Sequence, residues 1–150
     1  RDNGLGEAAG RLELLFYRAR YHPEYGSVFA VGDLLALVPD DEADVCVLEE
    51  PEHLNWFRAD GAAWPEKFRH VVGVVHTNYL AYTKHYKGGL YKRPLVFLFN
   101  QWMCRAYCHR IIKLSDALQP LANGKEVVCN VHGVRDVFLD TGRAMAATGG

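Results

Sequence analysis

The stretch Val71-Val72-Gly73-Val74-Val75, followed at once by His76, decides the fold. Four β-branched valines around one glycine favour a strand over a helix, because branched side chains lose rotamer freedom on a helix. The run has no polar alternation, which is typical of a strand that is covered on both faces in a parallel sheet. We therefore expect a parallel strand that ends at His76.

Other apolar runs flank this strand in the sequence. They predict strands at residues 12–17, 45–48, 111–114 and 127–131. Residues 94–110 predict the longest helix, since Pro94 suits a first helical position and apolar side chains then recur every three or four residues. Residues 115–121 predict a short helix or a turn capped by Ser115. Strands alternating with helices predict an α/β fold, with a Rossmann-like parallel sheet and flanking helices.

The composition is that of one globular domain, with 150 residues of which 49% are hydrophobic and 23% charged. Seventeen Lys and Arg against eighteen Asp and Glu leave a net charge of -1, which excludes a broad electrostatic surface for nucleic acid. No apolar run approaches the roughly 20 residues of a membrane-spanning helix.

The four cysteines lack disulfide or metal spacing and predict reduced, intracellular thiols. The chain begins at Arg1 without a readable targeting segment, and we expect it to be a piece of a longer polypeptide.

Polar side chains follow the predicted strands, at the edge where open α/β sheets bind ligands. Glu49, Glu50, Glu52 and His53 follow residues 45–48. They could form an acid/base group or a metal site, although their spacing is not that of known metal-ligand motifs, which disfavours a metal. Alternatively, they begin a helix with Pro51 in its first turn, where carboxylates complement the helix dipole, and we favour this interpretation for Glu52.

His76 opens a polar loop directly after the central strand. Its imidazole could donate to a sugar hydroxyl or to charge that develops in a reaction. From this position alone, we favour a histidine at the edge of the core that is bonded to a neighbouring backbone carbonyl. Cys104 and Cys108, four residues apart on the predicted helix, are expected to be small core residues.

A basic and aromatic segment, residues 84–93, precedes the predicted helix. Its cations are Lys84, Lys87, Lys92 and Arg93. Such a segment suits an anionic membrane surface, and it also suits a solvated loop before a helix.

Four segments resemble the digalactosyldiacylglycerol synthase family: ADVCVLEEPEHLNWF, FRHVVGVVHTNYLAY, RAYCHRIIKLS and VVCNVHGV. The resemblance runs in order from about Asp44 to Leu139. That family is similar to GT-B glycosyltransferases, in which two Rossmann-like domains face each other. The resemblance implies that residues 1–139 form part of the N-terminal, acceptor-side domain and that residues 140–150 begin the interdomain linker. By this resemblance, we expect the Gly-rich loop of the first domain and the C-terminal nucleotide-sugar domain to lie outside these 150 residues.

The resemblance also implies an activity, which is retaining transfer of galactose from UDP-galactose to monogalactosyldiacylglycerol, without a metal or other cofactor. In related enzymes a histidine after this strand reaches the transferred sugar, and His76 matches that position. Thr77 and Asn78 would support it, while Glu49, Glu50 and His53 would line the acceptor pocket. The implied location is peripheral, on the chloroplast outer envelope membrane.

Two alternatives to this activity stay open. A related glycosyltransferase could use another lipid or a soluble acceptor, because strand-end loops set acceptor choice in this fold. A protein of another class, a non-catalytic module that binds membrane lipid, would also explain the basic and aromatic segment. In either transferase, this fragment is expected to be inactive alone.

Overall fold

The computed structural model describes residues 6, 10–56, 61–83, 89–131 and 136–148. The strands are β1 (Ala19–His22), β2 (Ser27–Ala30), β3 (Val45–Glu49), β4 (His70–Val75), β5 (Arg110–Lys113) and β6 (Glu126–Val128). The helices are α2 (Pro51–Leu54), α3 (Trp64–Lys67), α4 (Tyr79–Tyr82), α5 (Gly89–Tyr107) and α6 (Asp136–Thr148), with 3-10 turns at Leu35–Leu37 and Asp40–Glu42.

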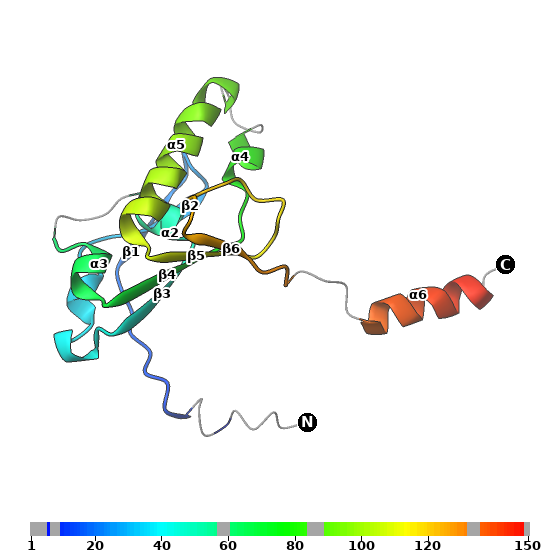
Figure 1. Cartoon of the computed structure of the whole chain (residues 1–150), viewed down its shortest axis with the longest axis horizontal. Helices are drawn as coiled ribbons and strands as arrows, with labels where there is room; N and C mark the ends of the chain where they lie inside the picture. The colour runs from blue at the N-terminus through cyan, green and yellow to red at the C-terminus, as the bar shows by residue number, and fades with distance from the viewer. Residues whose placement is uncertain (1–5, 7–9, 57–60, 84–88, 132–135, 149–150) are drawn as a thin grey trace.

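Four strands form one parallel sheet in the order β3-β4-β5-β6, which is also their order in the sequence. Right-handed crossovers that always step in the same direction place their helices on the same face of the sheet. Figure 1 shows α2 and α5 together over this sheet. The predicted α/β fold with a Rossmann-like parallel sheet is therefore confirmed, and it is consistent with the N-terminal domain of a GT-B enzyme. The expected cover on both faces is wrong in part, because Val72 and Val74 of β4 are only partly buried and Val47 of β3 is exposed.

The core lies between the sheet and these helices. Val71 and Ile111 are fully buried there, and so are the expected core residues Cys104 and Cys108. All four cysteines of the chain are free thiols. Gly73, in the middle of β4, has no room for a side chain, because a Cβ atom would lie 2.7 Å from Cγ of Pro51 and 2.9 Å from Sγ of Cys108. This close approach seats the start of α2 against the sheet.

The predicted strand at residues 12–17 is wrong. That run is irregular and exposed, with Phe16 at 88% exposure. The strands of this region are instead β1 and β2, an antiparallel hairpin outside the parallel sheet. An apolar run indicates only that a segment is suited to burial. Among the described residues, no strand pairs with residues 12–17. The last strand, β6, is also shorter than predicted and ends at Val128.

The long helix is displaced from its prediction. It begins at Gly89, so Pro94 lies inside it and removes one helical hydrogen bond instead of occupying the first position. It ends at Tyr107, because the N–H of His109 donates to Val71 O at 2.8 Å and the chain turns into β5. Arg110 therefore belongs to a strand and not to the helix. The predicted apolar stripe is wrong in part, since Leu95, Leu98 and Trp102 are exposed.

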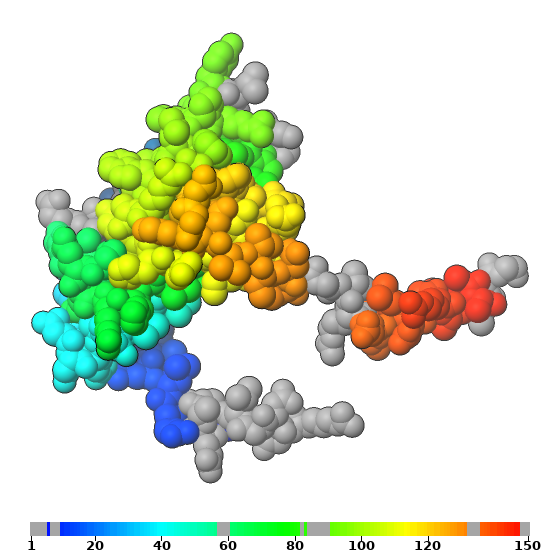
Figure 2. Space-filling model, in the orientation of Figure 1, coloured from blue at the N-terminus to red at the C-terminus, as the bar shows by residue number. Residues whose placement is uncertain are grey.

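Two smaller predictions concern the chain after β5. Residues 115–121 form a turn, in which Ser115 Oγ accepts a hydrogen bond from the N–H of Ala117 at 3.2 Å. Residue 140, where the linker was expected to begin, lies within α6, and the domain boundaries stay a prediction. Figures 1 and 2 show α6 apart from the α/β body. No helix of the described residues is both long and apolar enough to cross a membrane.

Candidate functional site

The carboxyl ends of β3 and β4 bring the predicted acidic and histidine residues together. Glu49 pairs with Val74 in the parallel register, and the N–H of Glu50 donates to Val74 O at 2.8 Å. His76 follows Val75 directly, so its ring emerges beside both carboxylates. The strand-edge argument therefore placed these three residues correctly.

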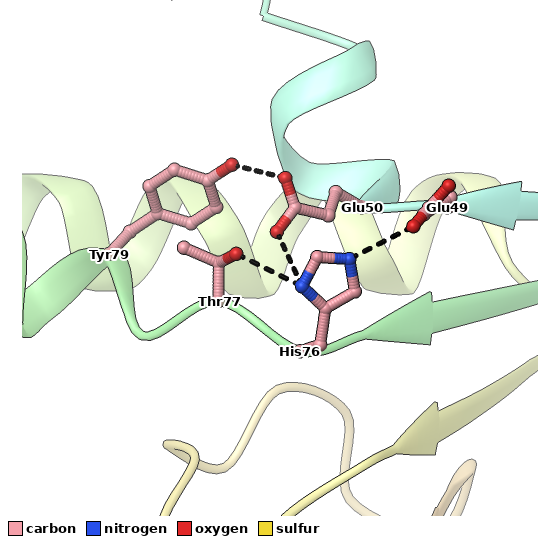
Figure 3. A network of polar contacts seen from close by, with 5 residues as sticks. All are labelled: Glu49, Glu50, His76, Thr77 and Tyr79. Atoms are coloured by element: carbon pink, nitrogen blue, oxygen red, sulfur yellow. Dashed lines mark hydrogen bonds and ion pairs between the residues drawn. The ribbon is translucent and has the colours of Figure 1, made fainter.

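His76 lies between the two carboxylates, as Figure 3 shows. Its Nε2 atom is 3.1 Å from Oε1 of Glu49, and its Nδ1 atom is 3.3 Å from Oε1 of Glu50. Thr77 Oγ1 lies 3.2 Å from the same Nδ1 atom. A neutral imidazole has one N–H and can donate to only one carboxylate, whereas the imidazolium donates to both. The pair of carboxylates thus fixes the plane of a partly exposed ring.

Tyr79 completes the network. Its hydroxyl donates to Oε2 of Glu50 at 2.7 Å, while the other oxygen of the same carboxylate faces His76 (Figure 3). The Glu50 side chain is only 19% exposed, compared with 80% for Glu49. Glu50 is therefore hydrogen-bonded through Oε2, while its buried Oε1 has no hydrogen bond and lies at ion-pair distance from His76. Glu49 is the carboxylate that faces solvent.

The backbone of Glu50 explains this orientation. Its φ of 51° lies in the left-handed region, which costs a residue with a Cβ atom about 1–2 kcal/mol. The conformation turns the chain from β3 into α2, and the carbonyl of Glu50 accepts from the N–H groups of His53 and Leu54. Strained backbone of this kind is concentrated at functional sites, where the surrounding structure maintains it. Here it directs the Glu50 carboxylate to His76.

His53 lies on the first turn of α2 and links the site to the hairpin. Its Nε2 atom is 2.7 Å from Ser27 Oγ, and its ring stacks on Tyr79 with an interplanar angle of 4°. Burial lowers the pKa of His53 from its ordinary value, against an opposing effect of the Glu50 charge. The ring is therefore mainly neutral at pH 7.

The remaining predicted residues have structural partners. Asn78 caps α4, because its side-chain oxygen accepts from the N–H of Ala81 at 3.1 Å. Its amide nitrogen donates to Ala117 O at 3.4 Å. The predicted roles of Asn78 and Thr77 toward substrate stay predictions.

Glu52 differs from its expectation. It does follow Pro51 in the first turn of α2, but only 1% of the residue is exposed. Burial raises the pKa of the Glu52 carboxyl to about 8, with a further contribution from the charge of Glu50. The group is therefore mostly protonated at neutral pH and does not complement the helix dipole as a carboxylate. This part of the interpretation is wrong, because the helix packs its acidic face inward against α5.

Two further points concern ligands. Among the described residues, no group of three or more His, Cys, Asp or Glu side chains could hold a metal ion. The two carboxylates contact opposite nitrogens of His76, so the three groups do not converge on one point.

Of the four basic residues that were predicted to face a membrane, Lys92 and Arg93 are exposed on α5, and Lys84 and Lys87 lie outside the described residues. Membrane contact by this segment stays a prediction.

A hollow of about 530 Å³ adjoins the site. Glu49, Glu50, His53 and His76 line its polar end, and most of its other walls are apolar.

Tyr79 was not predicted from the sequence as a site residue, although its position three residues after His76 was a usable signal. The contact of Tyr79 with Glu50 depends on the left-handed backbone at Glu50, and no residue type in the sequence indicates that conformation.

Comparisons with known proteins agree with the resemblance noted in the sequence. No family model matches the chain. It is 46% identical over 135 residues to digalactosyldiacylglycerol synthase 1, chloroplastic, from Glycine max, covering 90% of this chain and 17% of the relative. It is 46% identical over 142 residues to synthase 2 from Lotus japonicus, covering 95% of this chain and 30% of the relative. Synthase 2 from Arabidopsis thaliana is 46% identical over 130 residues, which is 27% of its length. The chain thus spans less than a third of the relatives it matches, and it corresponds to a segment of the digalactosyldiacylglycerol synthases.

Proposed function

We propose that this chain is part of a galactosyltransferase that moves galactose from UDP-galactose to monogalactosyldiacylglycerol and so forms digalactosyldiacylglycerol. The observation that carries the proposal is His76, which is held between two carboxylates at the carboxyl edge of the parallel sheet. The relatives are named for the digalactosyl lipid, which supports the product class.

In the proposed reaction, a hydroxyl of the acceptor sugar attacks the anomeric carbon on the face from which UDP departs. The bond from that carbon to the phosphate oxygen breaks, and the proton of the hydroxyl passes to the departing phosphate. Positive charge develops at the anomeric carbon, so preorganised dipoles and charges near it lower the barrier. His76 would contact the transferred sugar there. Glu50 and Glu49 would orient the ring, and neither carboxylate would act as a nucleophile.

The proposed enzyme has a membrane-bound substrate, which bears on its location and on its binding site. The protein would act peripherally at the chloroplast outer envelope, where its lipid acceptor resides, and the relatives are named chloroplastic. It would need no metal. The apolar hollow whose polar end is formed by His76 suits an amphiphilic acceptor.

A chimera tests the activity. This chain replaces the matching segment of the Glycine max relative, and transfer of labelled galactose from UDP-galactose to monogalactosyldiacylglycerol is measured in mixed micelles. We expect His76→Ala to lower kcat about 100-fold or more, by the usual magnitude of a lost catalytic side chain. His70→Ala is the matched control, because His70 is exposed at the opposite end of the same strand.

The outcomes separate the alternatives. Digalactosyl product that is lost with His76→Ala and kept with His70→Ala supports both the reaction and the residue. Equal turnover in the two variants contradicts the role of His76. Transfer to a different acceptor indicates a related glycosyltransferase, and binding of galactolipid micelles without transfer indicates a lipid-binding module.

A further inference from the structure

A second pocket, of about 360 Å³, adjoins the candidate site on the side of the hairpin. It is formed by the β1–β2 turn, the end of α2, the start of α4 and the first turns of α5. Thr77 and Tyr79 belong both to this pocket and to the network around His76. A ligand in the pocket would therefore lie next to the proposed reaction centre.

Aromatic rings form much of the pocket wall. Tyr25, Trp56 and Tyr79 line it together with His53. The ring centres of Trp56 and Tyr79 are 5.7 Å apart. Behind this wall, the ring centre of His53 is 4.8 Å from that of the buried Phe29. Phe29 is 3% exposed and belongs to the core, whereas Tyr25 is 47% exposed. The cluster thus has a packed inner layer and an outer layer that is open to a ligand.

The polar groups of the pocket carry mixed charge. Glu24 stands at the turn, and a hydrogen bond from His22 at 2.9 Å lowers the pKa of its carboxyl, so the group is an acceptor at neutral pH. Lys92 on α5 adds a donor, and the hydroxyls of Ser27 and Thr77, which already contact His53 and His76, add polar oxygens to the wall. One lysine opposed by one carboxylate does not form a phosphate site, which needs converging cations or backbone N–H groups. Rings with scattered donors and acceptors suit a neutral polyhydroxylated ligand.

We propose that this pocket binds a hexopyranose ring, stacked on the rings of Tyr25, Trp56 and Tyr79. The C–H face of a pyranose is apolar and matches an aromatic ring, while its hydroxyls match the surrounding donors and acceptors. Identifying the hexose as the galactosyl head group of the lipid acceptor rests on the proposed function. The same ring also occurs in the nucleotide-sugar donor, and the experiment separates these two sources.

The test is binding of two soluble probes to the 150-residue chain, galactosylglycerol and UDP-galactose, measured by saturation-transfer NMR and by titration. We expect galactosylglycerol to bind through its ring protons more tightly than UDP-galactose. Tyr25→Ala should weaken its binding roughly threefold or more, the usual worth of one aromatic stacking contact. Tyr21→Ala is the matched control, since Tyr21 is an exposed tyrosine of the same hairpin that does not line the pocket.

Each outcome decides the proposal. Weaker binding in Tyr25→Ala, with Tyr21→Ala unchanged, supports it. If Tyr25→Ala loses the circular-dichroism spectrum of the parent chain, Lys92→Met tests the same pocket from an exposed position on α5. Absence of galactosylglycerol binding, or equal binding in the pocket and control variants, overturns the proposal. Tighter binding of UDP-galactose overturns the assignment to the acceptor. The readout needs no catalysis, so it stands apart from failure of the transfer assay.

Discussion

Replacing Glu52 with glutamine should change how the stability of the protein depends on pH. The carboxyl is buried between α2 and the long helix, one of its oxygens has no hydrogen-bond partner, and burial raises its pKa from 4.5 to about 8. The unfolded chain releases this proton near pH 4.5, while the folded chain keeps it until about pH 8. The unfolded state therefore binds fewer protons in this window, so the free energy of unfolding falls as pH rises from 4.5 to 8.

The magnitude follows from the two pKa values. One pKa unit corresponds to about 1.4 kcal/mol, so raising the pKa from 4.5 to about 8 costs the folded state up to about 5 kcal/mol at pH 8 and above. Glutamine has nearly the same shape and does not ionise. Glu52→Gln should therefore match the parent chain near pH 4.5 and exceed it by up to about 5 kcal/mol at pH 8.5.

Urea unfolding of the parent chain and of Glu52→Gln, at pH 4.5, 6.5 and 8.5, measures this difference. His53 has a lowered pKa and adds stability as pH rises, but it is present in both proteins and cancels in the comparison. Glu42→Gln serves as the matched control, because Glu42 is exposed. If the stability difference between Glu52→Gln and the parent chain is the same at all three pH values, the reasoning about a buried, protonated carboxyl is refuted.

Two further predictions concern Gly73, which packs against Pro51, and Tyr79, which is hydrogen-bonded to Glu50. Gly73→Ala should destabilise the fold by about 1–3 kcal/mol in urea unfolding, because its Cβ atom would lie 2.7 Å from Pro51 Cγ. Gly142→Ala on α6, where a Cβ atom meets nothing within 4 Å, should be neutral or stabilising, and an equal loss in both variants would contradict the packing argument. Tyr79→Phe removes the hydroxyl bonded to Glu50 and keeps the ring, so in the chimera it should lower kcat about tenfold with little change in the KM of the acceptor. A rise in KM at constant kcat would instead assign the hydroxyl to substrate binding.

The network around His76 and the aromatic pocket share Tyr79, which gives that residue two separable contributions. Its ring contacts His53 and Trp56 in the pocket, and its hydroxyl holds the carboxylate that faces His76. Phenylalanine keeps the first contribution and removes the second. Comparing Tyr79→Phe with Tyr25→Ala therefore distinguishes positioning of the histidine from binding of the sugar.

Local pattern was sufficient to predict the strands β3 and β4 and the proximity of Glu49, Glu50 and His76. The valine-rich runs became β3 and β4 within one residue, because a run of β-branched side chains limits its own backbone conformation. Since parallel strands share their carboxyl edge, the position of Glu49, Glu50 and His76 beside one another followed from the order of the strands.

What only the tertiary structure decided depends on partners distant in sequence. Residues 12–17 are as apolar as a strand but have no strand to pair with in the described chain, so they stay exposed. Glu52 looks like an ordinary acidic residue in a first helical turn, and contact with α5 makes it a buried neutral acid. The left-handed backbone at Glu50 arises where Pro51 packs against Gly73, and it brings Tyr79 to the carboxylate. Sequence specifies local conformation through neighbouring atoms, whereas burial and charge state are set by the residues that the fold brings into contact.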